Sequence, residues 1–237
     1  KVMDIREIKG RIFDNISVQN ILISVFDKSG LEEFVNSLID INPKVRFLST
    51  GGTYKSIQNK LAVKTTNNLI EIAEYTDFPE MEGGLVKTLH PKIHAGILGE
   101  RDNSKHKEYL KNELNGAVYI DMVIVNLYPF EKVIAEPDVS FENARGNIDI
   151  GGLAMIRAAA KNFPSCAVVC HPNDYHEIVK HLEKNKGSTS FDVRFELAHK
   201  AFQTTAKYDS IITNYINKQL QKKDQIKKQY NFVKRLD

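Results

Sequence analysis

The sequence predicts an α/β fold built around a mainly parallel central sheet. Short apolar runs alternate along the chain with segments whose apolar residues recur at helical spacing, which is typical of a parallel sheet covered by helices. The first run, residues 20–26, is apolar almost throughout, as expected of a strand buried on both faces. Polar, glycine-containing turns at 27–30 and 49–53 follow the first two strands. Because the carboxyl ends of parallel strands share one edge of the sheet, we expect a ligand site there.

The remaining elements follow from the same periodicities. We expect further strands at residues 45–48, 63–65, 121–126 and 166–170. We expect helices from residue 31 to about 39 and at residues 54–61, 92–98, 102–114, 153–161, 173–185 and 190–220. Residues 131–145 should form a loop with a short helix. The segment 76–94 has two prolines, two glycines and little periodicity, and its apolar anchors favour a functional loop over a disordered one.

The bulk composition is that of an ordinary globular chain. Its 237 residues are 42% hydrophobic and 27% charged, which suits one large domain or two small ones. No apolar run approaches the roughly 18 residues of a membrane-spanning helix, and the N-terminal segment is too polar for a signal peptide. Cys166 and Cys170 lie about 13 Å apart along one expected strand, beyond disulfide reach, so we interpret them as buried thiols of a reducing compartment. We therefore expect a cytoplasmic protein without membrane contact.

The positive charge is concentrated at one end of the chain. Residues 216–237 carry a net charge of +5, which leaves −2 for the rest of a chain whose total is +3. A nucleic-acid-binding protein would gather basic residues on its folded face, so we expect no nucleic-acid partner. The basic end is most simply a solvated helix or a frayed end, and a contact with a polyanion is the alternative. We divide the chain into an N-terminal extension (1–19), a folded domain (20–217) and a basic C-terminal tail (218–237).

The turn Ser49-Thr50-Gly51-Gly52-Thr53 has the features of an anion site. It joins a strand to a helix, so unpaired N–H groups and the positive end of the helix dipole meet there. The two glycines let the backbone approach a ligand closely, and three hydroxyls add donors. The alternative is a structural turn in which Thr53 is the N-cap of the helix.

Two further candidates lie at the same expected edge of the sheet. Asp149 precedes Gly151-Gly152 at a second glycine-rich helix start, where it is either a functional carboxylate, an N-cap, or both. Pro129 ends the strand 121–126, which leaves Tyr128 at the carboxyl end of that strand.

Six blocks of sequence carry a resemblance to a known family. They are Ser24-Val-Phe-Asp-Lys-Ser-Gly30, Ser49-Thr-Gly-Gly-Thr53, Val86-Lys-Thr-Leu-His-Pro91, Asn126-Leu-Tyr-Pro-Phe130, Ile148-Asp-Ile-Gly-Gly152 and Arg157-Ala-Ala-Ala-Lys-Asn162. In this order and spacing the chain resembles the IMP cyclohydrolase domain of the bifunctional purine-biosynthesis protein (AICAR transformylase/IMP cyclohydrolase) over about residues 20–217. The resemblance implies a methylglyoxal-synthase-like, three-layer α/β/α fold and a homodimer. The transformylase domain of that family has no counterpart here, so we expect no transformylase activity.

The resemblance also implies a reaction. The carboxamide nitrogen of 5-formamidoimidazole-4-carboxamide ribotide attacks the formyl carbon of the same molecule, and water leaves to give IMP. This chemistry requires no cofactor and no metal. Because both reacting groups share one molecule, the enzyme must orient them, transfer protons and stabilise charge.

The residues implied by the resemblance fall into two groups. The catalytic group is Lys87, Tyr128, Asp149 and Lys161. The substrate-binding group is Ser24, Asp27, Lys28, Thr50, Gly51, Gly52, Thr53, Val86, Thr88, Asn126, Ile150 and Gly151. We expect the 5′-phosphate in the 50–53 turn with Lys28 nearby, Asn126 on the base or carboxamide, Lys87 on the developing oxyanion and Asp149 on the amide nitrogen. Either Lys161 or Tyr128 would protonate the departing oxygen.

Other interpretations of these residues stay open. Lys161, taken alone, is most often a surface lysine. His90 and His94 could share a helix face as metal ligands, but no third ligand has a suggestive spacing, so we expect no metal. Where this chain has Phe26, Leu85 and Ala154, the family usually has Ser, Arg and Thr. The alternative functions are a purine-nucleotide-binding regulatory module of the same fold and, less favoured, a methylglyoxal synthase.

Overall fold

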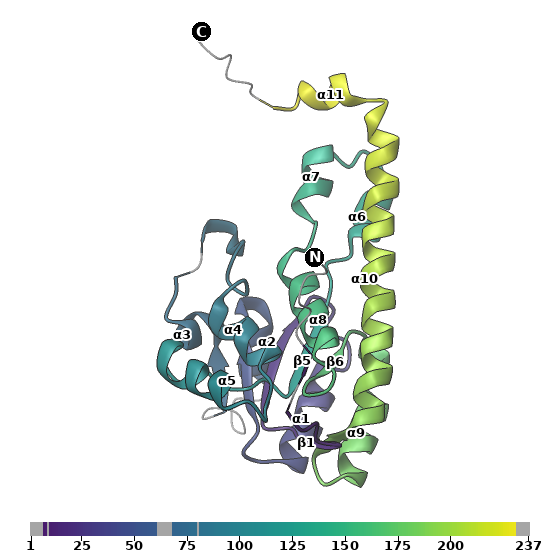
Figure 1. Ribbon diagram of the computed structural model, residues 1–237. Helices are drawn as coiled ribbons and strands as arrows, with labels where there is room; N and C mark the ends of the chain where they lie inside the picture. Colours follow the sequence, from purple (N-terminus) through teal and green to yellow (C-terminus); the bar gives the residue numbers. More distant parts are fainter. Residues whose placement is uncertain (1–6, 9, 61–67, 80, 231–237) are drawn as a thin grey trace.

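A computed structural model describes residues 7–8, 10–60, 68–79 and 81–230. Within these residues a five-stranded parallel sheet has the order β4-β3-β2-β5-β6. Its strands are β2 (Asn20–Val25), β3 (Arg46–Ser49), β4 (Leu69–Glu71), β5 (Met122–Asn126) and β6 (Ala167–Val169). Helices cover the sheet in a three-layer α/β/α arrangement, which confirms the predicted fold class (Figure 1).

The helices divide between the two sides of the sheet. On one side, α8 (Gly151–Lys161) packs on β5 and β6 and against α4 (Pro91–Leu98) and α10 (Phe191–Leu220). On the other, α1 (Leu31–Ile41) packs against α2 (Gly51–Lys60) and α9 (Tyr175–Lys184). The described residues also form α3 (Ile72–Thr76), α5 (Ser104–Glu108), α6 (Phe130–Ala135), α7 (Phe141–Gly146), α11 (Lys223–Lys227), 3₁₀ turns at Glu82–Gly84 and Pro172–Asp174, and a π-helical turn at Tyr109–Glu113.

The central strands are buried on both faces, as their continuous apolar sequence predicts. Ile21, Leu22 and Ile23 of β2 and their neighbours Val123 and Ile124 of β5 are fully buried. Phe34, from the apolar stripe of α1, stacks on the ring of Tyr175 in α9 with ring centroids 4.1 Å apart. These contacts make the sheet a rigid base, and the pairing of Val25 with Asn126 aligns the carboxyl ends of β2 and β5.

Helix α10 extends well past the sheet. Its 30 residues span about 45 Å, and α6 and α7 lie beside its outer half (Figure 1). A second apolar cluster joins the three helices, with Phe130, Ala144, Tyr208 and Tyr215 buried. A segment that follows β5 is therefore fastened to a helix near the end of the described chain.

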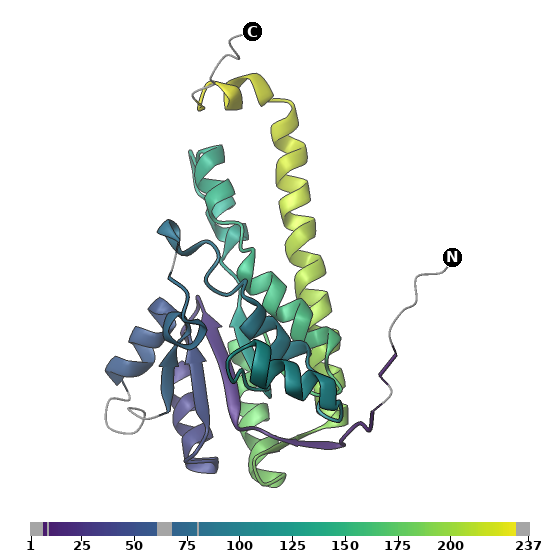
Figure 2. The same ribbon diagram turned by 60° about the vertical axis from the view of Figure 1, so that its left-hand side comes forward.

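Part of the expected N-terminal extension pairs with the folded body. Residues Asn15–Ser17 form β1, which pairs antiparallel with β7 (Ser188–Ser190) (Figure 2). The side chain of Ile16 is buried in this pairing. Three residues with one buried side chain carry no detectable periodicity, which explains why the sequence did not indicate either strand.

Several predicted boundaries shift. Helix α2 begins at Gly51 rather than at residue 54, so Thr53 lies inside the helix and is not its N-cap. The predicted strand at 63–65 lies outside the described residues, and β3 pairs with β2 on one side and with β4 on the other. The predicted helix 102–114 is divided between α5 and the π-helical turn. Cys166 and Cys170 are buried free thiols, as expected, and burial raises the pKa of both.

Candidate active site

A cavity of about 280 Å³ lies at the carboxyl edge of the sheet. Five segments enclose it: the end of β2, the end of β5, the start of α2, the loop 83–88 and the start of α8. Most of the predicted site residues line it, namely Ser24, Lys28, Thr50, Gly52, Thr53, Lys87, Thr88, Asn126, Tyr128, Asp149, Ile150 and Gly151. Turns separated by more than a hundred residues in the sequence thus meet at one place, because parallel strands deliver their carboxyl ends to one edge.

The first turn of α2 is fastened to β2 by hydroxyl groups. The hydroxyl of Thr53 accepts the N–H of Val25 at 3.0 Å and donates to the carbonyl of Val25 at 3.1 Å. The hydroxyls of Ser24 and Thr50 are 2.8 Å apart and both line the cavity. No acidic residue lies in this first turn, so the exposed N–H groups and the helix dipole favour an anion.

Lys87 lies against this turn. A Cβ atom at Gly51 would lie only 3.3 Å from Lys87 Nζ, so glycine allows the ammonium group to approach the α2 N-terminus. Gly51 does not itself line the cavity, but its lack of a side chain sets the position of the lysine. The ammonium group and the helix N-terminus therefore act on the same space.

Asp149 lies at the start of α8. Its Oδ1 accepts the N–H of Gly152 at 2.7 Å, and the N–H of Tyr128 also donates to this carboxylate. Burial raises the pKa of Asp149 above its ordinary value, and these two N–H groups oppose that shift only in part. The carboxylate thus caps the first turn of α8 and lines the cavity, and its catalytic role stays a prediction.

Gly151 allows the loop 83–88 to pack closely against α8. A Cβ atom at this position would lie 2.5 Å from Oγ1 of Thr88, whose side chain is buried. Any larger residue would push apart the two segments that carry Lys87 and Asp149.

Asn126 and Asp27 have tasks other than those expected. The Oδ1 atom of Asn126 accepts the N–H groups of Phe26 and Asp27 at 2.7 and 2.8 Å, and its Nδ2 donates to the carbonyl of Asp27 at 2.8 Å. The amide therefore shapes the turn after β2, and the expected contact of Asn126 with the base stays a prediction. The Asp27 carboxylate accepts the N–H and the hydroxyl of Ser29, which lower the pKa of Asp27, and it does not line the 280 Å³ cavity.

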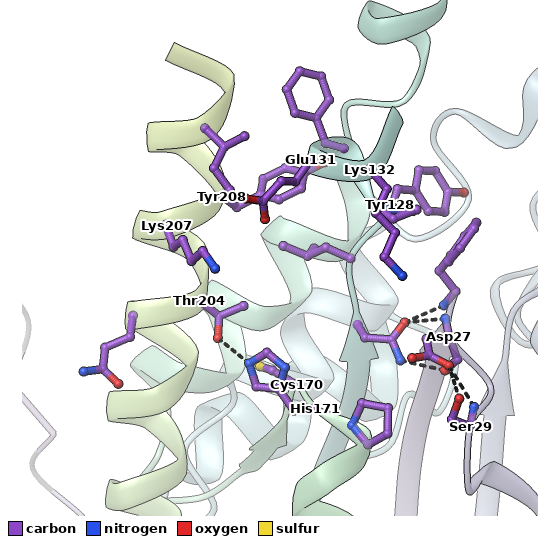
Figure 3. A pocket seen from close by; sticks show the side chains of 18 of the residues that line it. Asp27, Ser29, Tyr128, Glu131, Lys132, Cys170, His171, Thr204, Lys207 and Tyr208 are labelled. Atoms are coloured by element: carbon purple, nitrogen blue, oxygen red, sulfur yellow. Dashed lines mark hydrogen bonds between the residues drawn. The ribbon is translucent and has the colours of Figure 1, made fainter. Parts of the chain in front are cut away.

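A larger cavity of about 890 Å³ adjoins the first one (Figure 3). It lies between α10, the start of α6 and the ends of β5 and β6, and of the predicted residues only Asp27, Lys28, Asn126 and Tyr128 border it. Two of its lining side chains are paired, since His171 bonds Thr204 at 3.0 Å and Lys200 bonds Asp174 at 2.7 Å. Because most of the predicted site residues line the smaller cavity and only four border the larger one, we place the candidate active site in the smaller cavity.

Lys161 and Val86 are not brought to the cavity. Lys161 is the exposed last residue of α8, whereas the cavity lies at the first turn of this helix. Ten residues of helix separate Lys161 from Gly151 by about 15 Å. Val86 lies in the loop that carries Lys87 but does not line the cavity. The pattern Arg-Ala-Ala-Ala-Lys-Asn correctly predicts that Lys161 lies in a helix. Because the cavity is at the N-terminus of α8 and Lys161 is at its C-terminus, the length of the helix separates the two.

Two lining residues were named from the sequence only as departures from the family pattern. Phe26 and Leu85 both border the cavity, with 52% and 66% of their surfaces exposed. The rings of Phe26 and Tyr128 meet edge to face with centroids 5.8 Å apart, so they form one aromatic wall. The signal that identified Phe26 was its position inside the block Ser24–Gly30.

The histidines proposed as possible metal ligands differ in their contacts. His90 accepts the N–H of Lys92 at 3.1 Å and caps α4. His94 interacts with the backbone of Thr88, and its Nε2 atom is buried without a hydrogen-bond partner among the described residues. Across the described residues, no three His, Cys, Asp or Glu side chains gather into a possible metal site. In the same part of the chain, no helix combines the length and apolar character needed to cross a bilayer.

Two family models match the chain. The model described as an MGS-like domain matches residues 30–154, and the model described as the AICARFT/IMPCHase bienzyme matches residues 159–236. The first match includes the 50–53 turn, Lys87, Tyr128 and Asp149, which are the parts that enclose the cavity.

Relatives of known name match over most of the chain. The bifunctional purine biosynthesis protein PurH of Neisseria meningitidis serogroup A is 48% identical over 200 residues, and the protein of the same name from Chlorobium phaeobacteroides is 43% identical over 199 residues. Each alignment covers 84% of this chain and 36% of the relative, so the chain spans about a third of the length of these curated relatives. The crystal structure of ForH is similar, with a TM-score of 0.69 and 30% identity over 83% of this chain and 98% of that chain.

Proposed function

The chain belongs to the family of MGS-like domains, and on that premise we propose that it is an IMP cyclohydrolase. It closes the purine ring of 5-formamidoimidazole-4-carboxamide ribotide and releases water and IMP. The observation that carries the proposal is the convergence of Lys87, Asp149 and the 50–53 turn on one cavity. The bifunctional purine biosynthesis relatives support the pathway to which this reaction belongs.

The phosphate end of the ribotide binds at the N-terminus of α2. The N–H groups of the first turn and the hydroxyls of Ser24 and Thr50 supply donors there. Lys28 lines the same cavity, and its ammonium group donates to the carbonyls of Val25 and Phe26 at 3.3 Å. This arrangement fixes one end of the substrate, so that the two reactive arms at the other end are oriented by the protein rather than by chance.

The reacting end lies between Lys87 and Asp149. As the amide nitrogen bonds to the formyl carbon, the formyl oxygen gains negative charge, which Lys87 stabilises. Asp149 accepts the proton that the amide nitrogen releases, and its raised pKa makes it a stronger base than an ordinary carboxylate. The Tyr128 hydroxyl donates one proton to the departing oxygen, and Asp149 returns the proton that it accepted, so the C–O bond breaks and the oxygen leaves as water. The formamide nitrogen gives up its proton to the Tyr128 oxygen as the C=N bond of the ring forms, which restores both side chains. Lys161 has no role in this scheme because it lies at the far end of α8.

The wider setting of the enzyme follows the resemblance. We propose a cytoplasmic homodimer that acts on the small ribotide without a nucleic-acid or membrane partner. The mildly acidic charge of the chain before residue 216 supports the absence of a nucleic-acid partner.

Turnover of the ribotide tests the proposal. Purified protein mixed with the formamido ribotide should form IMP, measured by ultraviolet absorbance and confirmed by chromatography. Lys87→Ala should lower kcat at least 100-fold, on the order of the loss of an oxyanion donor. Lys55→Ala is the matched control, since Lys55 is an exposed lysine of α2 outside the cavity. Absence of IMP with a protein that melts cooperatively would contradict the proposal.

A further inference from the structure

The backbone of the segment before α8 is held by a tyrosine from a distant helix. The N–H of Asp149 donates to the hydroxyl of Tyr208 at 2.9 Å, and that hydroxyl donates to the carbonyl of Asn147 at 3.3 Å. Tyr208 lies in α10, 59 residues after Asp149. One hydroxyl group therefore holds both ends of the short segment that presents the Asp149 carboxylate.

Tyr208 is itself firmly positioned. Its side chain is 8% exposed, and its ring meets the ring of Phe130 edge to face at 6.3 Å. Figure 3 shows Tyr208 projecting from α10 toward the segment that carries Glu131. Burial raises the pKa of Tyr208 to about 12, so the hydroxyl stays protonated and keeps its donor. The hydroxyl can therefore donate to the carbonyl of Asn147 at neutral pH.

The two bonds act on the carboxylate through the backbone. The side chain of Asp149 is held through Oδ1, which accepts the N–H of Gly152. The backbone of Asp149 is held through its N–H, which donates to the hydroxyl of Tyr208. Without the hydroxyl, the Asp149 N–H loses its partner in a half-buried position, and the segment must rotate to find another. Such a rotation would move the carboxylate away from Gly152 and Tyr128.

We propose that Tyr208 is a positioning residue for Asp149, and that α10 takes part in catalysis through this hydroxyl. The inference rests on the proposed function, in which Asp149 accepts the proton of the amide nitrogen. Tyr208 lines the adjoining 890 Å³ cavity and not the 280 Å³ cavity of the proposed site, so in this proposal it orients the base without touching the substrate.

Removal of the hydroxyl tests the proposal. Tyr208→Phe should lower kcat about tenfold, equivalent to one misplaced catalytic group, while KM for the ribotide stays within about twofold. Tyr215→Phe is the matched control, because Tyr215 is buried in the same cluster and packs edge to face on the same Phe130 ring at 5.7 Å. Seven residues further along α10, its hydroxyl lies about 10 Å from the level of Tyr208. We expect Tyr215→Phe to retain the wild-type kcat.

The kcat and Tm of the two variants together distinguish a positioning role of Tyr208 from a structural role. Equal losses of kcat in both variants would overturn the proposal, and so would wild-type kcat in Tyr208→Phe. A fall in Tm in both variants with a fall in kcat only in Tyr208→Phe would support it.

A second measurement remains valid if the ribotide is not the substrate. Amide hydrogen exchange of residues 147–149 should be about tenfold faster in Tyr208→Phe than in Tyr215→Phe, because the Asp149 N–H has lost its acceptor. Unchanged exchange would overturn the positioning role. Faster exchange in a protein that makes no IMP would keep that role and reject only the proposed function.

Discussion

Asn126 and Asp27 are joined by a hydrogen bond in each direction. The N–H of Asp27 donates to Asn126 Oδ1 at 2.8 Å, and Asn126 Nδ2 donates to the carbonyl of Asp27 at 2.8 Å. The pair ties the end of β5 to the turn after β2, on which Lys28 is carried. Asn126, which the sequence suggests as a ligand contact, thus acts as a clamp that fixes the turn next to Lys28.

Removal of this clamp should weaken substrate binding. We expect Asn126→Ala to raise KM for the ribotide about tenfold with a smaller change in kcat, because the turn that carries Lys28 loses three hydrogen bonds. Steady-state kinetics measure the split. Asn185→Ala is the control, since the Asn185 amide also binds a backbone carbonyl, that of His181 at 2.7 Å, away from the cavity. A variant with lowered kcat and unchanged KM would instead place Asn126 at the reacting atoms.

The raised pKa of Asp149 predicts the acid side of the pH profile. The base acts only when ionised, so kcat/KM should fall as the pH drops through a pKa that lies above the ordinary value of an aspartate. Asp149→Asn should lower kcat at least 100-fold and abolish this acid limb. An acid limb that persists in the residual activity of Asp149→Asn would assign the titration to another group.

The same carboxylate should reduce stability at neutral pH. Burial raises the pKa of Asp149, so the folded protein holds this proton more tightly than the unfolded chain does. The free energy of unfolding therefore falls as the pH rises through the folded-state pKa. We expect Asp149→Asn to have a higher Tm than the wild type at pH 7, and the two Tm values to converge at about pH 3. Thermal melts across this range measure the difference, and a lower Tm for Asp149→Asn at pH 7 would contradict the expectation.

Arg194 should be the strongest single contributor to the attachment of the N-terminal segment. The guanidinium group is fully buried and donates to the carbonyls of Phe13, Asp14, Phe163, Pro164 and Thr189. Burial lowers the pKa of Arg194 to about 10, and the group stays charged at neutral pH. Arg194→Ala leaves these carbonyls without a donor, and we expect a loss of about 3 kcal/mol in urea unfolding.

The exposed Arg157, which lies over the ring of Phe202, provides the comparison for Arg194. Arg157→Ala should change the free energy of unfolding by about 0.5 kcal/mol or less, as is usual for surface sites. Equal losses in the two variants would show that the five carbonyl contacts add little.

The family resemblance and the structure lead to different expectations for Lys161. The resemblance implies that Lys161 is catalytic, whereas the structure places it at the exposed end of α8. We expect Lys161→Ala to keep kcat within about threefold of wild type, the range of an ordinary surface change, and Lys87→Ala to lose at least 100-fold. A loss in Lys161→Ala as large as that in Lys87→Ala would reject the placement of the reacting groups in the smaller cavity.

Much of the architecture could be predicted from the sequence, because each long strand or helix has a periodic apolar pattern of its own. The apolar runs of β2 and β5 and the stripe Leu31, Phe34, Val35, Leu38 and Ile39 of α1 are repeated over enough residues to identify their element. The pairing of β1 with β7 was not accessible, because each strand has three residues and their partners lie more than 170 residues apart. A pattern within a few residues cannot predict a contact between segments so far apart in the sequence.

The sequence by itself determined which turns follow the carboxyl ends of the strands, and therefore that Thr50, Tyr128 and Asp149 are candidates for one site; the resemblance to a known family added Lys87. Only the tertiary structure decided the contacts of the polar side chains. The Asn126 amide bonds the turn after β2, Lys161 lies at the end of α8 about 15 Å from its first turn, and the Tyr208 hydroxyl binds the backbone of Asp149. The physical reason is that strand order and periodicity specify where a backbone ends, whereas the partner of a polar side chain depends on packing between segments that are far apart in the chain.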